Sequence, residues 1–207
     1  MIIAIDGPAG AGKTTIGRAL ARYFRCKFIN TGAMYRAVAW ALQQGAQLEE
    51  TELNVDEQGR LIVDGQVLHE DKLYRLELDE FASKIARRPE VRVKLIALQR
   101  ELAKESNVVM EGRDIGTVVL PHADVKLYID APIRERARRR LHQRPRTSLE
   151  EILKELEDRD QRDQGFGRLS PAPDAVMLTT AGKTPEESIA QALQVVREAL
   201  GRKTSMP

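Results

Sequence analysis

Cysteine is almost absent from this chain of 207 residues, since Cys26 is its one thiol. A single cysteine excludes an internal disulfide framework and a C-x-x-C metal or redox motif, and we interpret Cys26 as a small, partly buried apolar side chain. No stretch reaches the roughly 18 consecutive apolar residues that a membrane-spanning helix needs. The first residues lack the basic region and long apolar run of a signal peptide. We therefore expect a cytoplasmic protein that does not bind membranes.

Net charge and aromatic residues are also scarce. Lys and Arg number 33 against 31 Asp and Glu, which gives a net charge of +2, and aromatic residues make up 4% of the sequence. A balance so close to neutral does not by itself indicate a nucleic-acid-binding protein. The 42% hydrophobic and 31% charged residues are typical of a folded domain, and the length predicts one domain. The histidines, His69, His122 and His142, lack metal-ligand spacing, and we interpret them as surface or structural residues.

Short apolar runs alternate with helical periodicity along the chain. Continuous runs of this length are typical of parallel strands that are buried on both faces. They lie at residues 2–5, 27–29, 107–110, 125–129 and 175–178. After the first run, apolar residues recur on one face of a helix at Ile16, Leu20, Tyr23 and Phe24. The alternation predicts an α/β protein whose open parallel sheet has helices on both faces.

The last helix has the clearest start and end signals. Thr184 is a candidate N-cap, Pro185 occupies the first helical position, and Glu187 completes a capping box. Gly201 is a candidate C-terminal stop. The predicted apolar stripe of this helix consists of Ile189, Leu193, Val196 and Leu200.

Two segments interrupt the alternation. Residues 47–82 include Asp64-Gly65 between two apolar runs, which predicts a tight hairpin in a small antiparallel meander. Residues 133–169 begin with seven arginines and one glutamate over positions 133–146. Composition alone favours a solvated helix face for that arginine run.

A glycine-rich motif immediately follows the first predicted strand. Gly7-x-x-x-x-Gly12-Lys13-Thr14 matches the phosphate-binding P-loop, in which backbone N–H groups and a helix N-terminus surround phosphate oxygens. The lysine of such a loop reaches the β- and γ-phosphates, and the hydroxyl after it binds Mg²⁺, so Thr14 is the predicted metal ligand. The predicted ATP-binding residues are Gly7, Pro8, Ala9, Gly10, Ala11, Gly12, Lys13, Thr14 and Thr15.

The P-loop changes the interpretation of the arginine run. A phosphotransferase needs cations to meet the charge that spreads over the moving phosphoryl group. Arg136 and Arg140 lie one helical turn apart and therefore share a face. We now favour a mobile, positively charged lid over a merely solvated helix.

Other stretches outside the P-loop carry a family resemblance that covers nearly the whole chain, in the same order. The most specific of them is the "GRDIGTVV" segment, which follows a predicted strand. With "DGPAGAGKTT" they closely resemble the bacterial cytidylate kinase family, which phosphorylates CMP and dCMP with ATP. The other stretches are "NTGAMYR" at 30–36, "FASKIARRPEVR" at 81–92, "EGRDIGTVVLP" at 111–121 and "RDQRD" at 159–163.

The resemblance implies a fold and a division of the chain. It implies a three-layer P-loop NTPase fold with a central five-stranded parallel sheet, a small antiparallel insert that binds the nucleoside monophosphate, and a helical lid. In this single kinase domain, residues 1–46, 106–132 and 170–207 form the core. Residues 47–105 form the insert and 133–169 the lid region. We expect a monomer that binds Mg²⁺, ATP and CMP or dCMP, and no nucleic acid.

The resemblance also implies site residues. Ser83, Arg92 and Asp114 match positions that read cytosine, and a carboxylate at Asp114 suits the 4-amino group, which uracil lacks. Arg36 and Arg113 match phosphate-binding arginines. The predicted catalytic cations are Lys13, Arg113, Arg136 and Arg140. The predicted CMP-binding residues are Thr31, Arg36, Ser83, Arg92, Arg113, Asp114, Arg159, Asp163 and Arg168.

Two positions depart from the family pattern. The family usually has a phosphate-binding arginine three residues after the aspartate that matches Asp163, and Phe166 occupies that place here. Arg168 is the candidate replacement, and Arg162 is a poorer one. Glu111 stands where related kinases often have an aspartate near the waters of Mg²⁺.

Three other functions are the alternatives. One is a different small-molecule P-loop kinase, acting for example on shikimate or UMP. Another is a nucleic-acid-binding module built on residues 133–146, but that segment has no aromatic residue to stack on bases. The third is a nucleotide-dependent switch, but the guanine-reading N-K-x-D motif is absent from the sequence.

Overall fold

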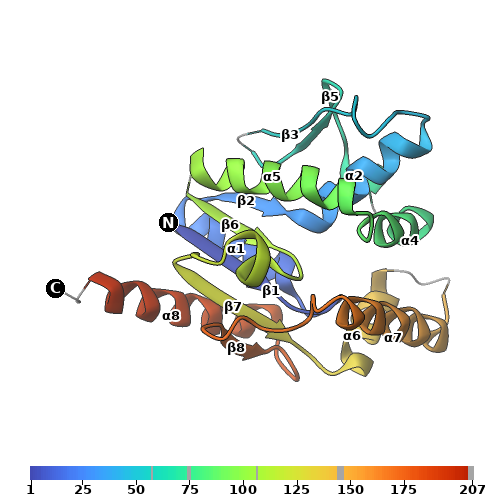
Figure 1. Ribbon diagram of the computed structural model, residues 1–207. Coiled ribbons are helices and arrows are strands. Elements are labelled where there is room, and N and C mark those ends of the chain that lie inside the picture. The colour runs from blue at the N-terminus through green and yellow to red at the C-terminus, as the bar shows by residue number, and fades with distance from the viewer. Residues whose placement is uncertain (57, 74–75, 106, 144–146, 205–207) are drawn as a thin grey trace. The chain divides into compact units, whose positions relative to one another are not determined.

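The computed structural model describes residues 1–56, 58–73, 76–105, 107–143 and 147–204 (Figure 1). The chain divides into two compact units. The larger unit comprises residues 1–26 and 109–207, and the smaller one comprises residues 27–108. The smaller unit therefore includes all of the predicted insert, residues 47–105.

The larger unit carries most of the central sheet and the helices beside it. Its strands are β1 (Ile2–Asp6), β6 (Val108–Glu111, whose first residue belongs to the smaller unit), β7 (Val125–Asp130) and β8 (Val176–Thr179). Its helices are α1 (Lys13–Phe24), the π-helical turn η1 (Ile115–Val119), α6 (Ile133–Gln143), α7 (Leu149–Gly165) and α8 (Pro185–Thr204). Helices α1 and α8 pack against each other, and η1 packs against β1.

The central sheet has the strand order β2-β6-β1-β7-β8, where β2 spans Lys27–Asn30. Parallel pairing places Ile3 of β1 opposite Val125 of β7, and Leu127 of β7 opposite Val176 of β8. The interior of β1 is buried on both faces, as a central parallel strand requires. The predicted α/β fold with a five-stranded parallel sheet is confirmed.

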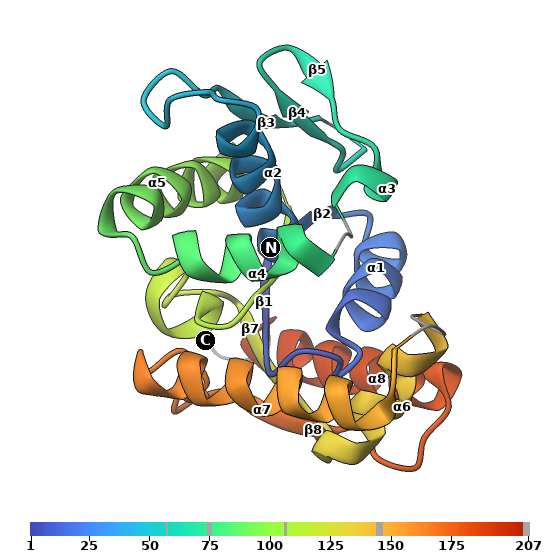
Figure 2. The ribbon, with the colours of Figure 1, turned by 90° about the vertical axis from the view of Figure 1, so that its right-hand side faces the viewer.

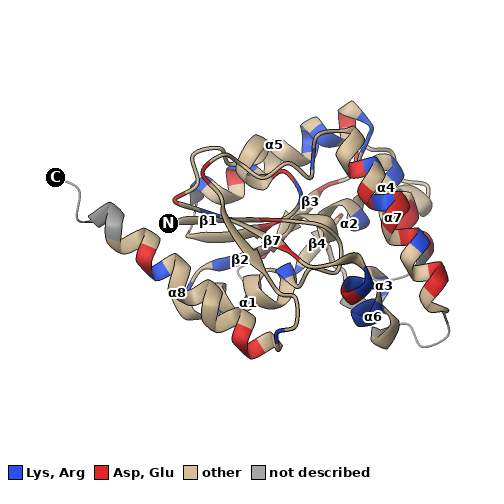
Figure 3. Cartoon of the chain, turned by 90° about the horizontal axis from the view of Figure 1, so that it is seen from below, with Lys and Arg blue, Asp and Glu red and all other residues tan. Residues whose placement is uncertain are grey.

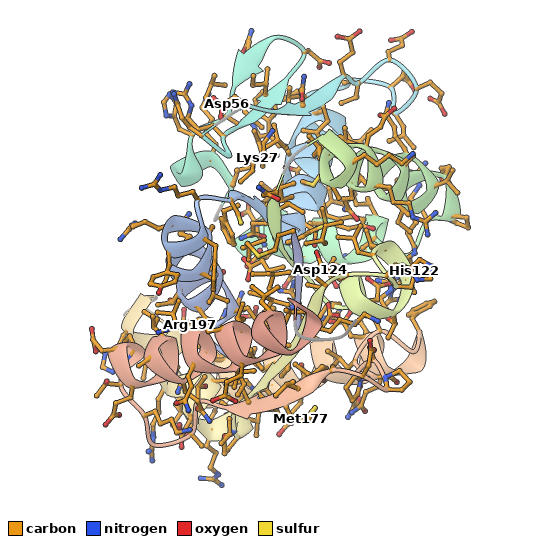
Figure 4. The ribbon with its side chains drawn as sticks, turned by 90° about the vertical axis from the view of Figure 1, so that its left-hand side faces the viewer. Lys27, Asp56, His122, Asp124, Met177 and Arg197 are labelled. Atoms are coloured by element: carbon orange, nitrogen blue, oxygen red, sulfur yellow. The ribbon has the colours of Figure 1, made fainter. Side chains whose placement is uncertain are left out.

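The edge strand β8 differs from the sequence expectation of a strand buried on both faces. Val176 is 39% exposed and Met177 is 55% exposed, since β8 has a sheet neighbour on one side only (Figure 4). An apolar run predicts a strand, but the sequence does not show whether that strand lies at the centre or at the edge of a sheet.

Two helix predictions were correct in part. The capping box of α8 is present, since the Glu187 N–H donates to Thr184 Oγ1 at 3.2 Å and the Thr184 N–H donates to Glu187 Oε2 at 2.8 Å. However, α8 continues through Gly201 to Thr204, so Gly201 does not end it. Tyr23 is 54% exposed, so it does not belong to the buried face of α1 on which its seven-residue spacing from Ile16 placed it.

The smaller unit combines helices with a second, antiparallel sheet. Its elements after β2 are α2 (Thr31–Gln43), β3 (Leu53–Val55), β4 (Leu61–Val63), β5 (Gln66–Val67), α3 (Glu70–Leu73), α4 (Leu76–Ile85) and α5 (Pro89–Glu105). The predicted hairpin joins β4 to β5, where Asp64 and Gly65 have φ values of 49° and 77° as a tight two-residue turn requires. Lys27, labelled in Figure 4, donates from Nζ to the Val55 carbonyl at 2.7 Å, and this hydrogen bond links β2 to the antiparallel sheet.

Candidate active site

The P-loop lies between β1 and α1 of the larger unit. Gly7, Gly10 and Gly12 have φ values of 143°, 78° and 94°. A Cβ atom at Gly7 would lie 2.0 Å from the main-chain oxygen of Ile129 on the neighbouring strand, so this position tolerates only glycine. Gly12 serves as the N-cap of α1 and directs the helix N-terminus toward the loop. This local geometry is that of an anion-binding backbone nest.

The carbonyl groups of the loop are held by side chains from other parts of the larger unit. Arg113 Nη1 donates to the Gly7 carbonyl at 3.0 Å, and Arg136 Nη1 donates to the Ala9 carbonyl at 3.1 Å. Thr180 Oγ1 donates to the Ala11 carbonyl at 3.0 Å. A nest needs its N–H groups on the ligand side, so its carbonyls must find donors elsewhere.

Lys13 is the buried cation of this site. Its side chain is almost fully covered, and Nζ donates to the Pro8 carbonyl at 2.8 Å. Burial depresses the pKa of Lys13 well below its usual value, and the positive charge of Arg113 lowers it further, while Glu111 opposes both effects. A bound polyphosphate would supply the negative charge that favours the protonated lysine.

A hydroxyl and a carboxylate meet beside the loop. Thr14 Oγ1 donates to Glu111 Oε1 at 2.7 Å, and Glu111 is buried at the end of β6. Mg²⁺ prefers oxygen ligands and is usually held by one or two protein groups together with phosphate oxygens and waters. The side chains of Thr14 and Glu111 fit such an ion. Among the described residues, no group of three or more His, Cys, Asp or Glu side chains forms a metal cage.

Asp6 is a site residue that the sequence analysis missed. Its two carboxylate oxygens accept hydrogen bonds from the N–H groups of Ile115 and Gly116, at 2.8 and 2.7 Å. These bonds fix the start of η1 immediately after Arg113 and Asp114, so Asp6 orients the "GRD" segment. Burial raises the pKa of Asp6 to about 6, and the two N–H bonds oppose that rise. In the sequence, the one signal that could have identified Asp6 as a site residue was its position directly before Gly7.

The two helices of the predicted lid carry opposite charge. Helix α6 has five arginines and one glutamate, and α7 has seven acidic and three basic residues, so their formal charges are +4 and −4. Figure 3 shows this contrast, and Figure 2 shows the helices side by side. Arg136 pairs with Asp160 at 2.6 Å, and Arg140 pairs with Glu155 at 3.0 Å. Residues 144–146 of the predicted arginine run lie outside the described residues.

The C-terminal part of α7 brings more predicted residues to the P-loop. Asp163 accepts from Arg113 Nε at 3.1 Å, so one arginine joins this helix to the loop. The Arg168 guanidinium lies over the Phe166 ring at 5.0 Å, and the Arg168 N–H donates to the Asp163 carbonyl at 2.9 Å. The turn through Gly167 thus brings the backbone of Arg168 next to that of Asp163, and the role of Arg168 as a replacement for the family arginine stays a prediction. Arg159 lies on the same helix.

The smaller unit holds the remaining predicted residues. Thr31 begins α2 after the N-cap Asn30, whose side chain accepts from the Ala33 N–H at 2.9 Å. Arg36 is buried on α2 and pairs with Asp79 of α4 at 3.2 Å, a partner that the sequence analysis did not identify. The other two predicted cytosine-reading residues of this unit are Ser83 on α4 and Arg92 on α5.

The side chains of the three histidines lie on the surface. His69, His122 and His142 are all exposed, and Figure 4 shows His122 in the segment that leads into β7. Within the part of the chain that the structure describes, no helix is both long enough and apolar enough to cross a membrane.

Comparison with known proteins assigns the sequence pattern to one family. The cytidylate kinase family profile matches residues 3–198. A cytidylate kinase of Cereibacter sphaeroides is 42% identical over 97% of this chain and 98% of the relative. A cytidylate kinase of Desulfitobacterium hafniense is 40% identical over 95% of this chain and 92% of the relative. The chain also matches a bifunctional pantoate ligase/cytidylate kinase of Synechococcus at 37% identity, and there it spans 41% of the relative's length.

Solved structures support the fold. A gluconokinase from Sinorhizobium meliloti has a TM-score of 0.54 at 16% identity and covers 99% of this chain and 97% of its own. TT1252 from Thermus thermophilus has a TM-score of 0.51 at 23% identity and covers 97% of each chain. At these identities the similarity concerns the fold alone.

Proposed function

The chain belongs to the cytidylate kinase family, and we propose that it transfers the γ-phosphoryl group of ATP to CMP or dCMP, which yields CDP or dCDP and ADP. The observation that carries the proposal is the P-loop geometry. Its glycines adopt left-handed backbone conformations, its carbonyls are bound by outside donors, and Lys13 is buried within it. This arrangement leaves the main-chain N–H groups to bind the ATP phosphates.

Cations of the larger unit would neutralise the transferred group. Lys13 lies in the P-loop, and Arg113 donates to the Gly7 carbonyl of that loop. Arg136 and Arg140 lie on the lid helix α6. Mg²⁺, held through Thr14 and Glu111, would supply further positive charge at the β- and γ-phosphates. Phosphoryl transfer depends mainly on such charge neutralisation and on alignment of donor and acceptor.

The acceptor would be recognised through its phosphate and its base. We assign Arg36, Arg113 and Arg168 to the α-phosphate, because guanidinium groups bind phosphate as forked donors. Asp114 would accept from the cytosine 4-amino group, and Ser83 and Arg92 would complete the base contacts. Thr31, Arg159 and Asp163 would contact the rest of the nucleotide.

No general base is needed for this reaction. The second pKa of a phosphate monoester is about 6, so the CMP phosphate is mostly a dianion at neutral pH. Its oxygen attacks the γ-phosphorus, a new P–O bond forms, and the bond to the β-phosphate bridging oxygen breaks as ADP leaves.

A coupled assay of ADP release tests the proposal and separates it from its rivals. CMP, dCMP, UMP, AMP and shikimate are offered as acceptors at equal concentration with MgATP. We expect rapid turnover with CMP or dCMP and slow turnover with the other three. Preferential use of shikimate or AMP would overturn the acceptor assignment but leave the P-loop assignment intact. Monomeric state and cytoplasmic location stay predictions of the sequence.

A further inference from the structure

We propose that Asp160 is a positioning residue for the P-loop and acts on it through Arg136. This inference rests on the proposed function, because it takes the loop to be the ATP phosphate site. Asp160 lies on α7, far from the loop in sequence, and the family resemblance assigned no role to it.

The contacts of Arg136 carry the argument. Its guanidinium joins three acceptors, since Nε donates to the Ala131 carbonyl at 2.9 Å, Nη1 to the Ala9 carbonyl at 3.1 Å, and Nη2 to Asp160 Oδ2 at 2.6 Å. Arg136 is 5% exposed, so its charge lies in a region that water hardly reaches. A buried guanidinium needs a carboxylate partner, and among these three acceptors of Arg136 the charged one is Asp160.

The bridge holds one particular peptide of the loop. The Ala9 carbonyl must point away from the nest if the N–H groups around Gly10 are to face a phosphate. A Cβ atom at Gly10 would lie 3.2 Å from Arg136 Cβ and 3.3 Å from its carbonyl oxygen, so α6 lies directly against this peptide. Without Asp160, the guanidinium would lose its anchor on α7 and its fixed direction toward Ala9.

A second bridge of the same design strengthens the inference. Arg113 joins the Gly7 carbonyl to Asp163, just as Arg136 joins the Ala9 carbonyl to Asp160. Asp160 and Asp163 are three residues apart and share a face of α7. The helix therefore holds the loop at two alternate carbonyls. Of the Asp160 carboxylate, Oδ1 is buried and has no hydrogen-bond partner among the described residues, and Oδ2 accepts from Arg136.

The test compares Asp160→Asn with Asp158→Asn. Asp158 is exposed, lies on the same helix and undergoes the same chemical change, so it is the matched control. Binding of a non-hydrolysable ATP analogue with Mg²⁺ and binding of CMP are measured separately by calorimetry. We expect Asp160→Asn to weaken binding of the ATP analogue by about 10-fold, since the other loop carbonyls keep their donors. CMP affinity should match that of Asp158→Asn.

Arg136→Lys gives an independent measure, because lysine keeps the charge but cannot join three acceptors. If Asp160 acts through Arg136, the double variant should bind the analogue no more weakly than Arg136→Lys alone. Unchanged analogue binding in Asp160→Asn would overturn the proposal, as would equal weakening of analogue and CMP binding, which would indicate a general loss of structure. Because ATP-analogue binding is measured without an acceptor, an error in the CMP assignment would not affect this result.

Discussion

The buried carboxylate of Asp6 should make the free energy of unfolding depend on pH. Asp6 is 4% exposed, and its pKa is raised to about 6 from an ordinary value of 3.8. Between these two pH values the unfolded chain has lost the Asp6 proton while the folded chain keeps it. The folded state then binds one more proton, so the free energy of unfolding must fall as the pH rises.

The magnitude follows from the size of the pKa difference. One pKa unit corresponds to about 1.4 kcal/mol, so a difference of about 2 units removes about 3 kcal/mol of stability as the pH rises from about 4 to about 6. The direction is opposite to that of an aspartate whose folded pKa is depressed. Asp56, which accepts hydrogen bonds from the Arg60 backbone and side chain, is such an aspartate.

The assay is urea unfolding of the parent chain and of Asp6→Asn across this pH range. The variant cannot titrate at position 6, so its free energy of unfolding relative to the parent should rise by about 3 kcal/mol from low to neutral pH. Absolute stability is not the readout, since an asparagine amide also changes the bonds to Ile115 and Gly116. Asp56→Asn is the control and should give the opposite trend. Parallel curves for parent and Asp6→Asn, or an Asp6 ¹³C titration midpoint near 4, would refute the reasoning.

Three further predictions concern the proposed reaction. Lys13→Ala should lower turnover on the order of 10³-fold while calorimetry shows unchanged CMP binding, and near-normal turnover would remove Lys13 from the phosphate site. Asp114→Asn should reduce the preference for CMP over UMP by about 10-fold or more in kcat/KM, because an amide offers a donor to the uracil carbonyl; an unchanged ratio would exclude Asp114 from base recognition. Gly7→Ala should abolish binding of an ATP analogue, because its Cβ would lie 2.0 Å from the Ile129 oxygen. Gly45→Ala is the control, since Gly45 also has a positive φ, 90°, but nothing within 4 Å of its Cβ position; equal losses in both variants would attribute the effect to backbone strain alone.

Much of the fold was predictable because its signals are local. Continuous apolar runs gave the five strands of the central sheet to within a residue at each end, and Asp64-Gly65 gave the hairpin. The P-loop was predictable for the same reason, since its glycines, lysine and threonine are contiguous. The capping box of α8 depends on Thr184 and Glu187, which are three residues apart and read directly from the sequence.

The partners of the site residues were not predictable in the same way. Asp79, Asp160 and Thr180 each contact a predicted site residue or a loop carbonyl across a long sequence separation. Their spacing carries no period that one helix or strand would impose. Asp6 is adjacent to the P-loop in sequence, but its hydrogen-bond partners lie 109 and 110 residues away. Such contacts depend on which strands and helices pack together in the folded chain. The residue pattern of a single sequence does not contain that information.

The arginine run shows how tertiary structure changes the meaning of a local charge. From the sequence alone, positions 133–146 have three possible interpretations: a solvated helix face, a lid or a nucleic-acid contact. In the structure, α6 with its formal charge of +4 packs against α7 with a formal charge of −4, and Arg136 and Arg140 pair with carboxylates of α7. An RNA phosphate would have to compete with Asp160 and Glu155 for Arg136 and Arg140. The acidic helix thus argues against a nucleic-acid contact through Arg136 and Arg140.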